Sequence, residues 1–150
     1  MKKVAFYTLG CKVNQYETNA MIEQFIKANY KLVDFEDKSD IYIINTCTVT
    51  NMSDRKSRQT IRRVKQLNPN SILVVTGCYA QVAAKELEKI EEIDLIVGNT
   101  EKKDIVNIVE KILRRNCRGR RLCRPAKQQY RKFIHQQNQP NRYKQSKRIC

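Results

Sequence analysis

The sequence predicts an α/β fold, a three-layer sandwich in which a parallel sheet of the flavodoxin-like or Rossmann-like kind has helices on both faces. Short runs of β-branched and aliphatic residues alternate along residues 1–113 with segments whose apolar residues recur every three or four positions. This strand–helix alternation with short connections is typical of parallel sheets covered on both sides. The pattern stops after Leu113, where a basic segment without apolar periodicity begins.

Five apolar runs account for the expected strands. Val, Ile and Leu dominate most of these runs instead of alternating with polar residues, as expected for strands that are buried on both faces. Four runs are clear and the second is weaker; in chain order they are Val4–Leu9, Lys31–Phe35, Ile41–Ile44, Ile72–Val75 and Leu95–Val97. The sequence therefore predicts a five-stranded sheet without fixing the order of its strands.

Four segments have the period of an amphipathic helix, and the second begins with Ser53 as its expected cap. The helices are expected at Asn19–Ala28, Ser53–Leu67, Gln81–Ile90 and Lys103–Leu113. Their apolar stripes consist of Met21, Ile22, Phe25 and Ile26; Ile61, Val64 and Leu67; Val82, Leu87 and Ile90; and Ile105, Ile108, Val109 and Ile112.

Charge divides the chain at the same point. Residues 1–113 hold 17 Lys and Arg against 15 Asp and Glu, whereas residues 114–150 hold 13 Lys and Arg and no acidic residue. The net charge of +15 therefore describes the segment 114–150 and not the domain before it. Since this segment has scattered apolar residues and is interrupted by Pro125 and Pro140, it is expected to be mostly disordered, with at most a short helix around Gln128–Gln136.

Neither an export signal nor a membrane span is expected from the sequence. No stretch approaches the roughly 18 consecutive apolar residues of a membrane span. The run Val4–Leu9 after Lys2 and Lys3 is too short for a secretory signal and lacks a cleavage site. The protein is therefore expected in the cytoplasm, without a membrane partner, and its six cysteines are expected to be reduced thiols.

Three cysteines share one structural position. Cys11, Cys47 and Cys78 each follow a predicted strand and lie before the next helical segment. Ligands of open α/β sheets bind at this carboxyl edge, and helix amino termini there favour thiolates, the form that binds metals. Gly10 and Gly77 precede two of these cysteines and allow the backbone to approach a bulky ligand. Three thiolates would leave one iron of a four-iron, four-sulfur cluster without a protein ligand, as catalytic sites do.

Two other interpretations stay open at this point. A free cysteine is often a small buried hydrophobic residue, and this explanation would suffice for any one of the three alone. Zinc is the rival of an iron–sulfur cluster, although zinc sites usually contain a close Cys-x-x-Cys pair. The three cysteines are instead 36 and 31 residues apart, which suits a site that folding assembles.

The segments around these cysteines form three motifs, and a fourth signature follows them: Leu9-Gly10-Cys11-Lys12-Val13-Asn14-Gln15-Tyr16-Glu17, Asn45-Thr46-Cys47-Thr48-Val49, Gly77-Cys78-Tyr79-Ala80-Gln81 and Val97-Gly98-Asn99. Together these motifs resemble those of a known family, the radical-SAM methylthiotransferases. The resemblance covers about residues 1–113. The first motif is most similar to the branch that methylthiolates threonylcarbamoyladenosine 37 in tRNA, and less similar to the isopentenyladenosine and ribosomal-protein branches.

The resemblance implies cofactors and a partner. Cys11, Cys47 and Cys78 would hold an auxiliary 4Fe–4S cluster, whose open iron would carry the sulfur to be transferred. S-adenosylmethionine and a second 4Fe–4S cluster would belong to a separate radical-SAM domain. The substrate would be adenosine 37 in the anticodon loop of tRNA, modified at C2. Residues 1–113 would thus be the amino-terminal iron–sulfur domain of a transferase, and no catalytic residue is assigned within it.

The chain also departs from the family. The radical-SAM cluster needs Cys-x-x-x-Cys-x-x-Cys, a spacing that Cys117, Cys123 and Cys150 do not provide, so the chain is expected to be inactive alone. One hypothesis is that residues from about 114 onward are an out-of-frame translation, which translating the gene in its other frames would test. The alternative is a stand-alone iron–sulfur or zinc module whose basic tail, 114–150, binds RNA in a salt-dependent way, with Tyr130, Phe133 and Tyr143 available for stacking.

The remaining candidates have ordinary explanations. The helix after Cys47 carries a basic face, expected to be a solvated surface with a minor phosphate-contact role as the alternative: Arg55, Lys56, Arg58, Arg62 and Arg63. Several polar residues are expected to cap helices rather than to bond cluster sulfurs: Thr8, Asn14, Asn45, Thr46 and Asn51. Tyr79 is either a packing residue or a wall of the substrate cavity. His135, the only histidine, lies in the tail and is given no role.

Overall fold

The computed structural model describes residues 1–47 and 51–117, except for the side chains of residues 51–54 and 115–117. The predicted disorder of the tail, its short helix at Gln128–Gln136 and the aromatic residues assigned to RNA stacking lie outside the described residues. The same holds for Cys123, His135 and Cys150, and for the side chain of Cys117. Ser53 is not the predicted helix cap, because the helix that contains it begins two residues earlier, at Asn51.

Five parallel strands form one sheet in the order β2-β1-β3-β4-β5. The strands are β1 (Lys3–Thr8), β2 (Lys31–Leu32), β3 (Ile41–Thr46), β4 (Ile72–Gly77) and β5 (Leu95–Val97). This is the flavodoxin-like order, in which the direction of winding reverses between β1 and β3. The predicted fold class and all five strands are confirmed, although β2 is shorter than the predicted run and lies at the edge of the sheet.

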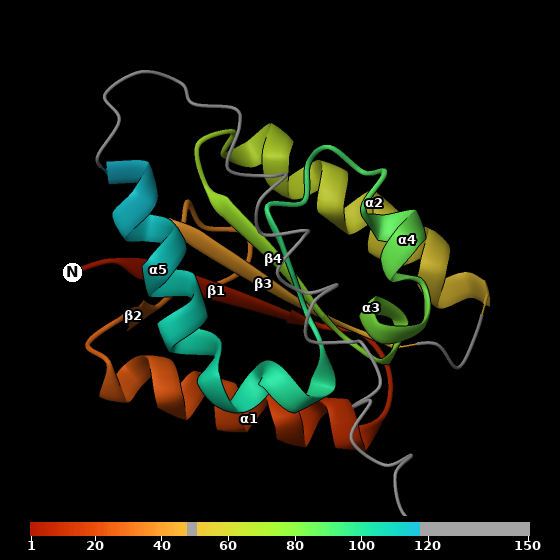
Figure 1. Cartoon of the computed structure of the whole chain (residues 1–150), viewed down its shortest axis with the longest axis horizontal. Coiled ribbons are helices and arrows are strands. Elements are labelled where there is room, and N and C mark those ends of the chain that lie inside the picture. Colours follow the sequence, from red (N-terminus) through yellow and green to blue (C-terminus); the bar gives the residue numbers. More distant parts are fainter. Residues whose placement is uncertain (48–50, 118–150) are drawn as a thin grey trace, which may run out of the picture.

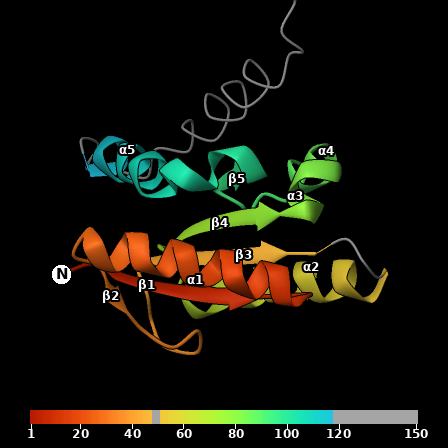
Figure 2. The ribbon, with the colours of Figure 1, turned by 90° about the horizontal axis from the view of Figure 1, so that it is seen from below.

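Helices cover both faces of the sheet, as Figures 1 and 2 show. One face packs against α1 (Lys12–Lys27) and α5 (Ile105–Cys117), and the other against α2 (Asn51–Leu67) and the short helices α3 (Cys78–Val82) and α4 (Ala84–Leu87). A 3-10 segment, η1 (Asn99–Asp104), leads from β5 into α5. The helix α5 extends to Cys117, and the predicted domain boundary at residue 113 stays a prediction.

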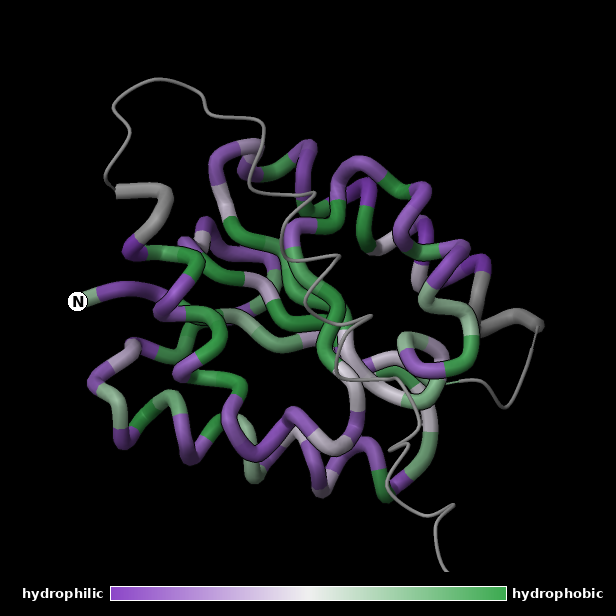
Figure 3. The backbone as a smooth tube through the Cα atoms, in the orientation of Figure 1, coloured by the Kyte–Doolittle hydropathy of each residue, from purple (hydrophilic) through white to green (hydrophobic). Residues whose placement is uncertain are grey.

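The two apolar layers are built from alternate residues of the same strands. Ile41 and Ile43 of β3 face the layer that contains Met21 and Phe25 of α1, whereas their neighbour Ile44 faces the layer that contains Ile61 of α2. All six side chains are at most 1% exposed. In Figure 3 the central strands are accordingly hydrophobic and the helices change between hydrophobic and hydrophilic along their length. Burial on both faces explains why the strands read as apolar runs.

The structure corrects three details of the predicted helices. The first helix begins at Lys12, directly after Cys11, and not at Asn19, because its first turns carry polar residues that the apolar period does not reveal. Ile26 and Leu67, predicted in apolar stripes, are 53% and 37% exposed. The predicted helix Gln81–Ile90 is replaced by α3 and α4.

That replacement has a local cause. Ala83 lies between α3 and α4 with φ −108° and ψ 29°, outside the regular helical region, so the backbone turns there. The helix α3 buries Tyr79 and Ala80, which turns Val82 outward, where it is 80% exposed. Leu87 of α4 is fully buried, as predicted.

Within residues 1–47 and 51–117, no helix combines the length and the apolar character that crossing a membrane requires.

Candidate functional site

Three cysteine-bearing loops meet at the carboxyl edge of neighbouring strands. The strands β1, β3 and β4 are adjacent and parallel, so they end at the same side of the sheet, near α3 in Figure 1. Thr46 of β3 pairs with Gly77 of β4, and the next residues along both strands are Cys47 and Cys78. Cys11 follows β1, which lies on the other side of β3. Cys11 and Cys47 therefore flank the point where the strand order reverses, the usual ligand position of such sheets.

Cys11 and Cys47 lie against each other. A Cβ atom at Gly10 would overlap the Cβ of Cys47 and would come within 2.8 Å of its Sγ. The side chain of Cys47 is also within hydrogen-bond reach of the Cys11 thiol. Gly10 has φ +115°, which an L side chain rarely adopts, so glycine is needed both for the turn and for this contact.

The start of α1 stabilises the thiolate of Cys11. Cys11 occupies the N-cap position of this 16-residue helix and has an exposed side chain. The backbone N–H groups of Asn14 and Val13 lower the pKa of its thiol, an effect that partial desolvation opposes. Donors at a helix amino terminus favour the charged form of an acceptor. Cys11 is therefore disposed to ligate a metal as a thiolate.

The Cys78 loop is equally close to the Cys47 loop. Gly77 has φ +105°, and a Cβ atom there would lie 2.7 Å from both Oδ1 of Asn45 and the backbone N of Thr46. Cys78 is the first residue of α3 and is partly exposed, whereas Cys47 is only 3% exposed. The site is thus deepest at Cys47 and opens toward Cys11.

Buried polar side chains lie behind the cysteines. Asn14 donates to the carbonyls of Leu9 and Thr46, and Asn45 donates to the carbonyl of Asn14 at 3.0 Å and to Oγ1 of Thr18 at 3.1 Å. Two hydroxyl groups also form hydrogen bonds here. Oγ1 of Thr8 donates to Oγ1 of Thr18, and Oγ1 of Thr46 donates to the carbonyl of Thr76. None of these bonds caps a helix, because α1 has no side-chain cap. The expectation that Thr8, Asn14, Asn45 and Thr46 are capping residues is therefore wrong, and Asn51 lies outside the described side chains.

Three buried polar atoms at this end of the sheet have no hydrogen-bond partner among the described residues. They are Oδ1 of Asn45, Oγ1 of Thr76 and Oδ1 of Asn99. Asn45 and Thr76 are register partners on β3 and β4, and Asn99 follows β5. Buried unpaired polar atoms are rare in folded proteins, and each calls for an explanation such as strain, a water molecule or a further bound group.

No group of three or more Cys, His, Asp and Glu side chains within the described ranges is arranged to hold a single metal ion. The three predicted ligands are thus brought to one edge, with Cys11 and Cys47 in contact, but their sulfurs do not converge on one point.

The basic face of α2 is confirmed as exposed surface, and part of it is neutralised. Arg58 pairs with Glu86 at 3.1 Å and Arg63 pairs with Glu36 at 2.5 Å. Arg55, Lys56 and Arg62 are exposed and form no ion pair with any described residue.

Tyr79, next to Cys78, is a packing residue. It is 8% exposed within the apolar layer under α2, and its hydroxyl accepts a hydrogen bond from Arg58 at 3.4 Å. The alternative role as an open wall of a substrate cavity is therefore not supported.

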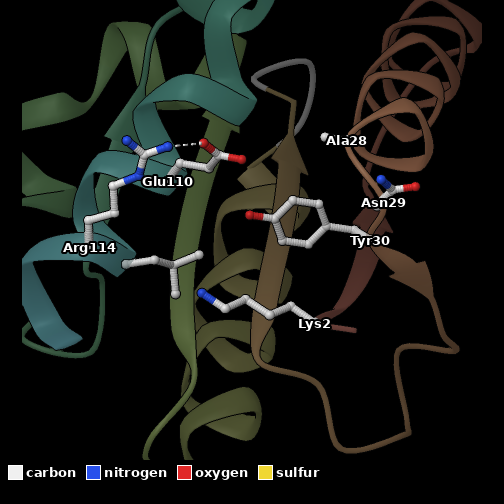
Figure 4. A pocket seen from close by; sticks show the side chains of 7 residues that line it. Lys2, Ala28, Asn29, Tyr30, Glu110 and Arg114 are labelled. Atoms are coloured by element: carbon white, nitrogen blue, oxygen red, sulfur yellow. Dashed lines mark hydrogen bonds and ion pairs between the residues drawn. The ribbon is translucent and has the colours of Figure 1, made fainter.

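A separate pocket of about 280 Å³ lies at the opposite edge of the sheet. Figure 4 shows Tyr30 and Lys2 facing Glu110 and Arg114 of α5, which form an ion pair at 3.1 Å. Burial raises the pKa of Tyr30, and Glu110 adds to this rise while Arg114 opposes it. None of the residues singled out from the sequence as functional lines this pocket.

Comparison with known proteins identifies similar sequences. Residues 3–98 match the model of uncharacterized protein family UPF0004. The chain is 53% identical over 113 residues to the threonylcarbamoyladenosine tRNA methylthiotransferase MtaB of Aquifex aeolicus, covering 75% of this chain and 28% of that protein. It is 48% identical over 110 residues to MtaB of Bacillus subtilis, covering 73% and 24%. The chain thus spans about a quarter of the length of these relatives.

Two further similarities are more distant. The ribosomal protein uS12 methylthiotransferase RimO of a Thermoanaerobacter species is 33% identical over 115 residues, covering 75% of this chain and 26% of that protein. Among solved structures, a pilus assembly-related protein from Burkholderia pseudomallei superimposes with a TM-score of 0.52 at 8% identity, covering 74% of this chain and 88% of that chain. This last likeness concerns the fold alone.

Proposed function

Because the chain belongs to the UPF0004 family and corresponds to the amino-terminal domain of MtaB-type methylthiotransferases, we propose that Cys11, Cys47 and Cys78 hold an auxiliary 4Fe–4S cluster. The domain would serve the addition of a methylthio group at C2 of threonylcarbamoyladenosine 37 in tRNA. The relatives are named as tRNA methylthiotransferases, and the cluster, the substrate position and the role of this chain are our proposal.

The observation that carries the proposal is the common position of the three cysteines. Each follows one of the adjacent strands β1, β3 and β4, at the edge where sheets of this order bind ligands. Cysteine thiolates are the usual ligands of iron–sulfur clusters, and three of them leave one iron open.

The arrangement of the donors suits a cluster better than a single zinc ion. A mononuclear zinc site needs ligands that converge on one tetrahedral centre, and the described residues contain no such group. In a cluster each thiolate binds a different iron, so the sulfurs lie around the cluster and not around one point. The glycines at positions 10 and 77 keep Cβ atoms out of the gaps between the loops. Oδ1 of Asn45 is buried and has no hydrogen-bond partner among the described residues, as expected if a further group binds beside it.

The residues of this chain have distinct parts in the proposed site. Cys11 presents a sulfur whose charge the amide groups of Asn14 and Val13 stabilise, and Cys47 supplies the buried ligand. Cys78, at the start of α3, completes the set. When bound, the cluster would supply an iron at which the sulfur for transfer is held.

The other components of the reaction lie outside this domain. A Cys-x-x-x-Cys-x-x-Cys motif does not occur in the 150 residues, so S-adenosylmethionine and the second cluster would be bound by a separate radical-SAM domain. The chain alone is expected to be unable to turn over. Arg55, Lys56 and Arg62 on α2, a helix that begins four residues after Cys47, offer uncompensated positive charge for the phosphates of tRNA.

Anaerobic reconstitution of the full chain with iron and sulfide tests the proposal. About four irons per chain and a brown chromophore are expected for one cluster. Changing Cys11, Cys47 or Cys78 to Ala should abolish the chromophore, whereas the matched triple variant Cys117→Ala, Cys123→Ala, Cys150→Ala should keep it. Loss in the triple variant with retention in the single variants would overturn the assignment.

A second candidate is a stand-alone iron–sulfur or zinc module whose basic tail binds RNA. The 13 Lys and Arg of residues 114–150, without any acidic residue, favour it. Its signature would be one zinc per chain after purification in place of iron, together with RNA affinity that disappears when residues 114–150 are removed. Translation of the gene beyond the codon for Leu113 in the other frames tests the competing hypothesis of an out-of-frame tail.

A further inference from the structure

We propose that Asn14 is the positioning residue of the cysteine site, because its side-chain amide fixes the loop that carries Cys11 against the loop that carries Cys47. The inference rests on the proposed function, since it concerns the same site. Asn14 lies in the first turn of α1, three residues after Cys11, and is 1% exposed.

One amide group bridges the two loops. Nδ2 of Asn14 donates to the carbonyl of Leu9 at 2.9 Å and to the carbonyl of Thr46 at 3.1 Å. Leu9 is two residues before Cys11, and Thr46 directly precedes Cys47. The NH₂ group has two hydrogens at a fixed angle, and each is used by a different loop. The planar amide therefore sets the separation of the two backbones next to the cysteines.

The main chain of Asn14 extends the same bridge. Its carbonyl accepts hydrogen bonds from Oγ1 of Thr18 and from Nδ2 of Asn45. Asn45 in turn lies against Gly77, the residue before Cys78, at the distance that excludes a side chain there. Asn14 thus contacts the first two cysteine loops directly and reaches the third through Asn45.

No other residue type serves this position equally. Asp has no hydrogens to donate to two carbonyls, and Gln would place its amide one methylene further away. Ala would leave the carbonyl of Thr46 in a buried environment without this donor, which is costly in a protein interior. The bridge therefore depends on the amide itself, and not only on filling the space.

The test measures how closely the thiols of Cys11 and Cys47 are held before any cluster is present. The cluster-free full chain, with Cys117, Cys123 and Cys150 changed to Ser, is titrated with phenylarsine oxide. This reagent forms two As–S bonds with a pair of neighbouring thiols and releases water, so no oxidant is needed. Peptide mapping of the adduct shows which cysteines have reacted.

We expect Asn14→Ala to weaken arsenical binding by the Cys11–Cys47 pair about tenfold, which corresponds to the loss of one to two hydrogen bonds. Gln15→Ala, a change at the neighbouring exposed position, should leave the affinity within about twofold of the parent. Ser39→Ala removes a buried hydrogen bond, from Oγ of Ser39 to the carbonyl of Ile41, at the other end of β3 from Cys47. It should lower the thermal midpoint and leave the arsenical affinity near that of the parent.

The outcomes separate this proposal from the cluster proposal. If Asn14→Ala binds the arsenical as tightly as the parent, or if Ser39→Ala weakens binding equally, Asn14 has no special positioning role. Failure of the parent to bind iron while the Asn14 effect persists would overturn the cluster and leave the positioning intact. Circular dichroism shows whether Asn14→Ala folds. If it does not fold, Asn14→Ser tests the proposal in its place. A serine hydroxyl can donate to only one of the two carbonyls, so this variant should also bind the arsenical more weakly.

Discussion

Lys102 and Glu17 form an ion pair that joins η1, after the last strand, to the first half of α1. The side chain of Lys102 is 8% exposed and that of Glu17 is 33% exposed, so the pair is largely withdrawn from water. It joins α1, the helix that has Cys11 at its N-cap, to the segment that follows β5, the strand at one edge of the sheet. The two residues are 85 positions apart in the chain.

Glu17→Gln should therefore destabilise the domain by about 2 kcal/mol, because it leaves the Lys102 ammonium buried without its counter-charge. Urea unfolding of both proteins measures this change. The matched control is Glu110→Gln, which breaks the more exposed Arg114–Glu110 pair one helical turn apart and should cost only about 0.5 kcal/mol. Equal effects of the two changes would contradict the assignment.

Gly77→Ala should both destabilise the domain and impair iron binding. The added Cβ would meet Asn45 and the backbone of Thr46, and a φ of +105° is strained for alanine, with a cost of about 1–3 kcal/mol from the backbone alone. Iron content after reconstitution and the urea midpoint measure the two effects. Gly98→Ala is the matched control, since its Cβ would make only an ordinary van der Waals contact, with Oε2 of Glu101 at 3.8 Å, and its φ is −71°. A Gly77→Ala protein as stable as Gly98→Ala would show that the loops are not packed as described.

Tyr30 should make the domain less stable at alkaline pH. Its pKa is raised in the folded state, mainly by burial, so the folded protein retains the phenolic proton after the unfolded chain has lost it. The stabilising contribution is then fully present below about pH 10 and is lost as pH rises through the folded pKa. Urea midpoints at pH 9 and pH 11 should fall more for the parent than for Tyr30→Phe. An identical fall in the two proteins would contradict the prediction.

Neutralising the unpaired charges of α2 should weaken tRNA binding. The triple variant Arg55→Gln, Lys56→Gln, Arg62→Gln removes three positive charges from α2, and the slope of log affinity against log salt should decrease by up to about 3 if each contacts a phosphate. Filter binding of the full chain at several salt concentrations measures the slope.

The control for the α2 variant removes three positive charges from other helical segments of the domain. Lys27→Gln, Lys103→Gln, Lys111→Gln changes three exposed lysines of α1, η1 and α5 and leaves the net charge equal to that of the α2 variant. If both triple variants lose the same affinity and slope, α2 contributes only to the general charge of the protein.

Much of the fold could be predicted from local sequence. The runs Ile41–Ile44, Ile72–Val75 and Leu95–Val97 all lie within strands of the sheet, because a strand buried on both faces must be apolar throughout. The placement of Cys47 and Cys78 followed from the ends of the same runs. The order β2-β1-β3-β4-β5 could not be derived, since several orders satisfy the same pattern of strands and helices.

The sequence by itself determined the parallel α/β architecture and the location of three cysteines at strand ends, because both depend on residues close together in the chain. Only the tertiary structure decided that Cys47 lies against Gly10 and that one amide of Asn14 joins two loops. It also decided that the polar residues of the motifs bridge loops and do not cap helices. These features depend on contacts between positions some thirty residues or more apart, and local patterns of polarity carry no information about which distant backbone a side chain will meet.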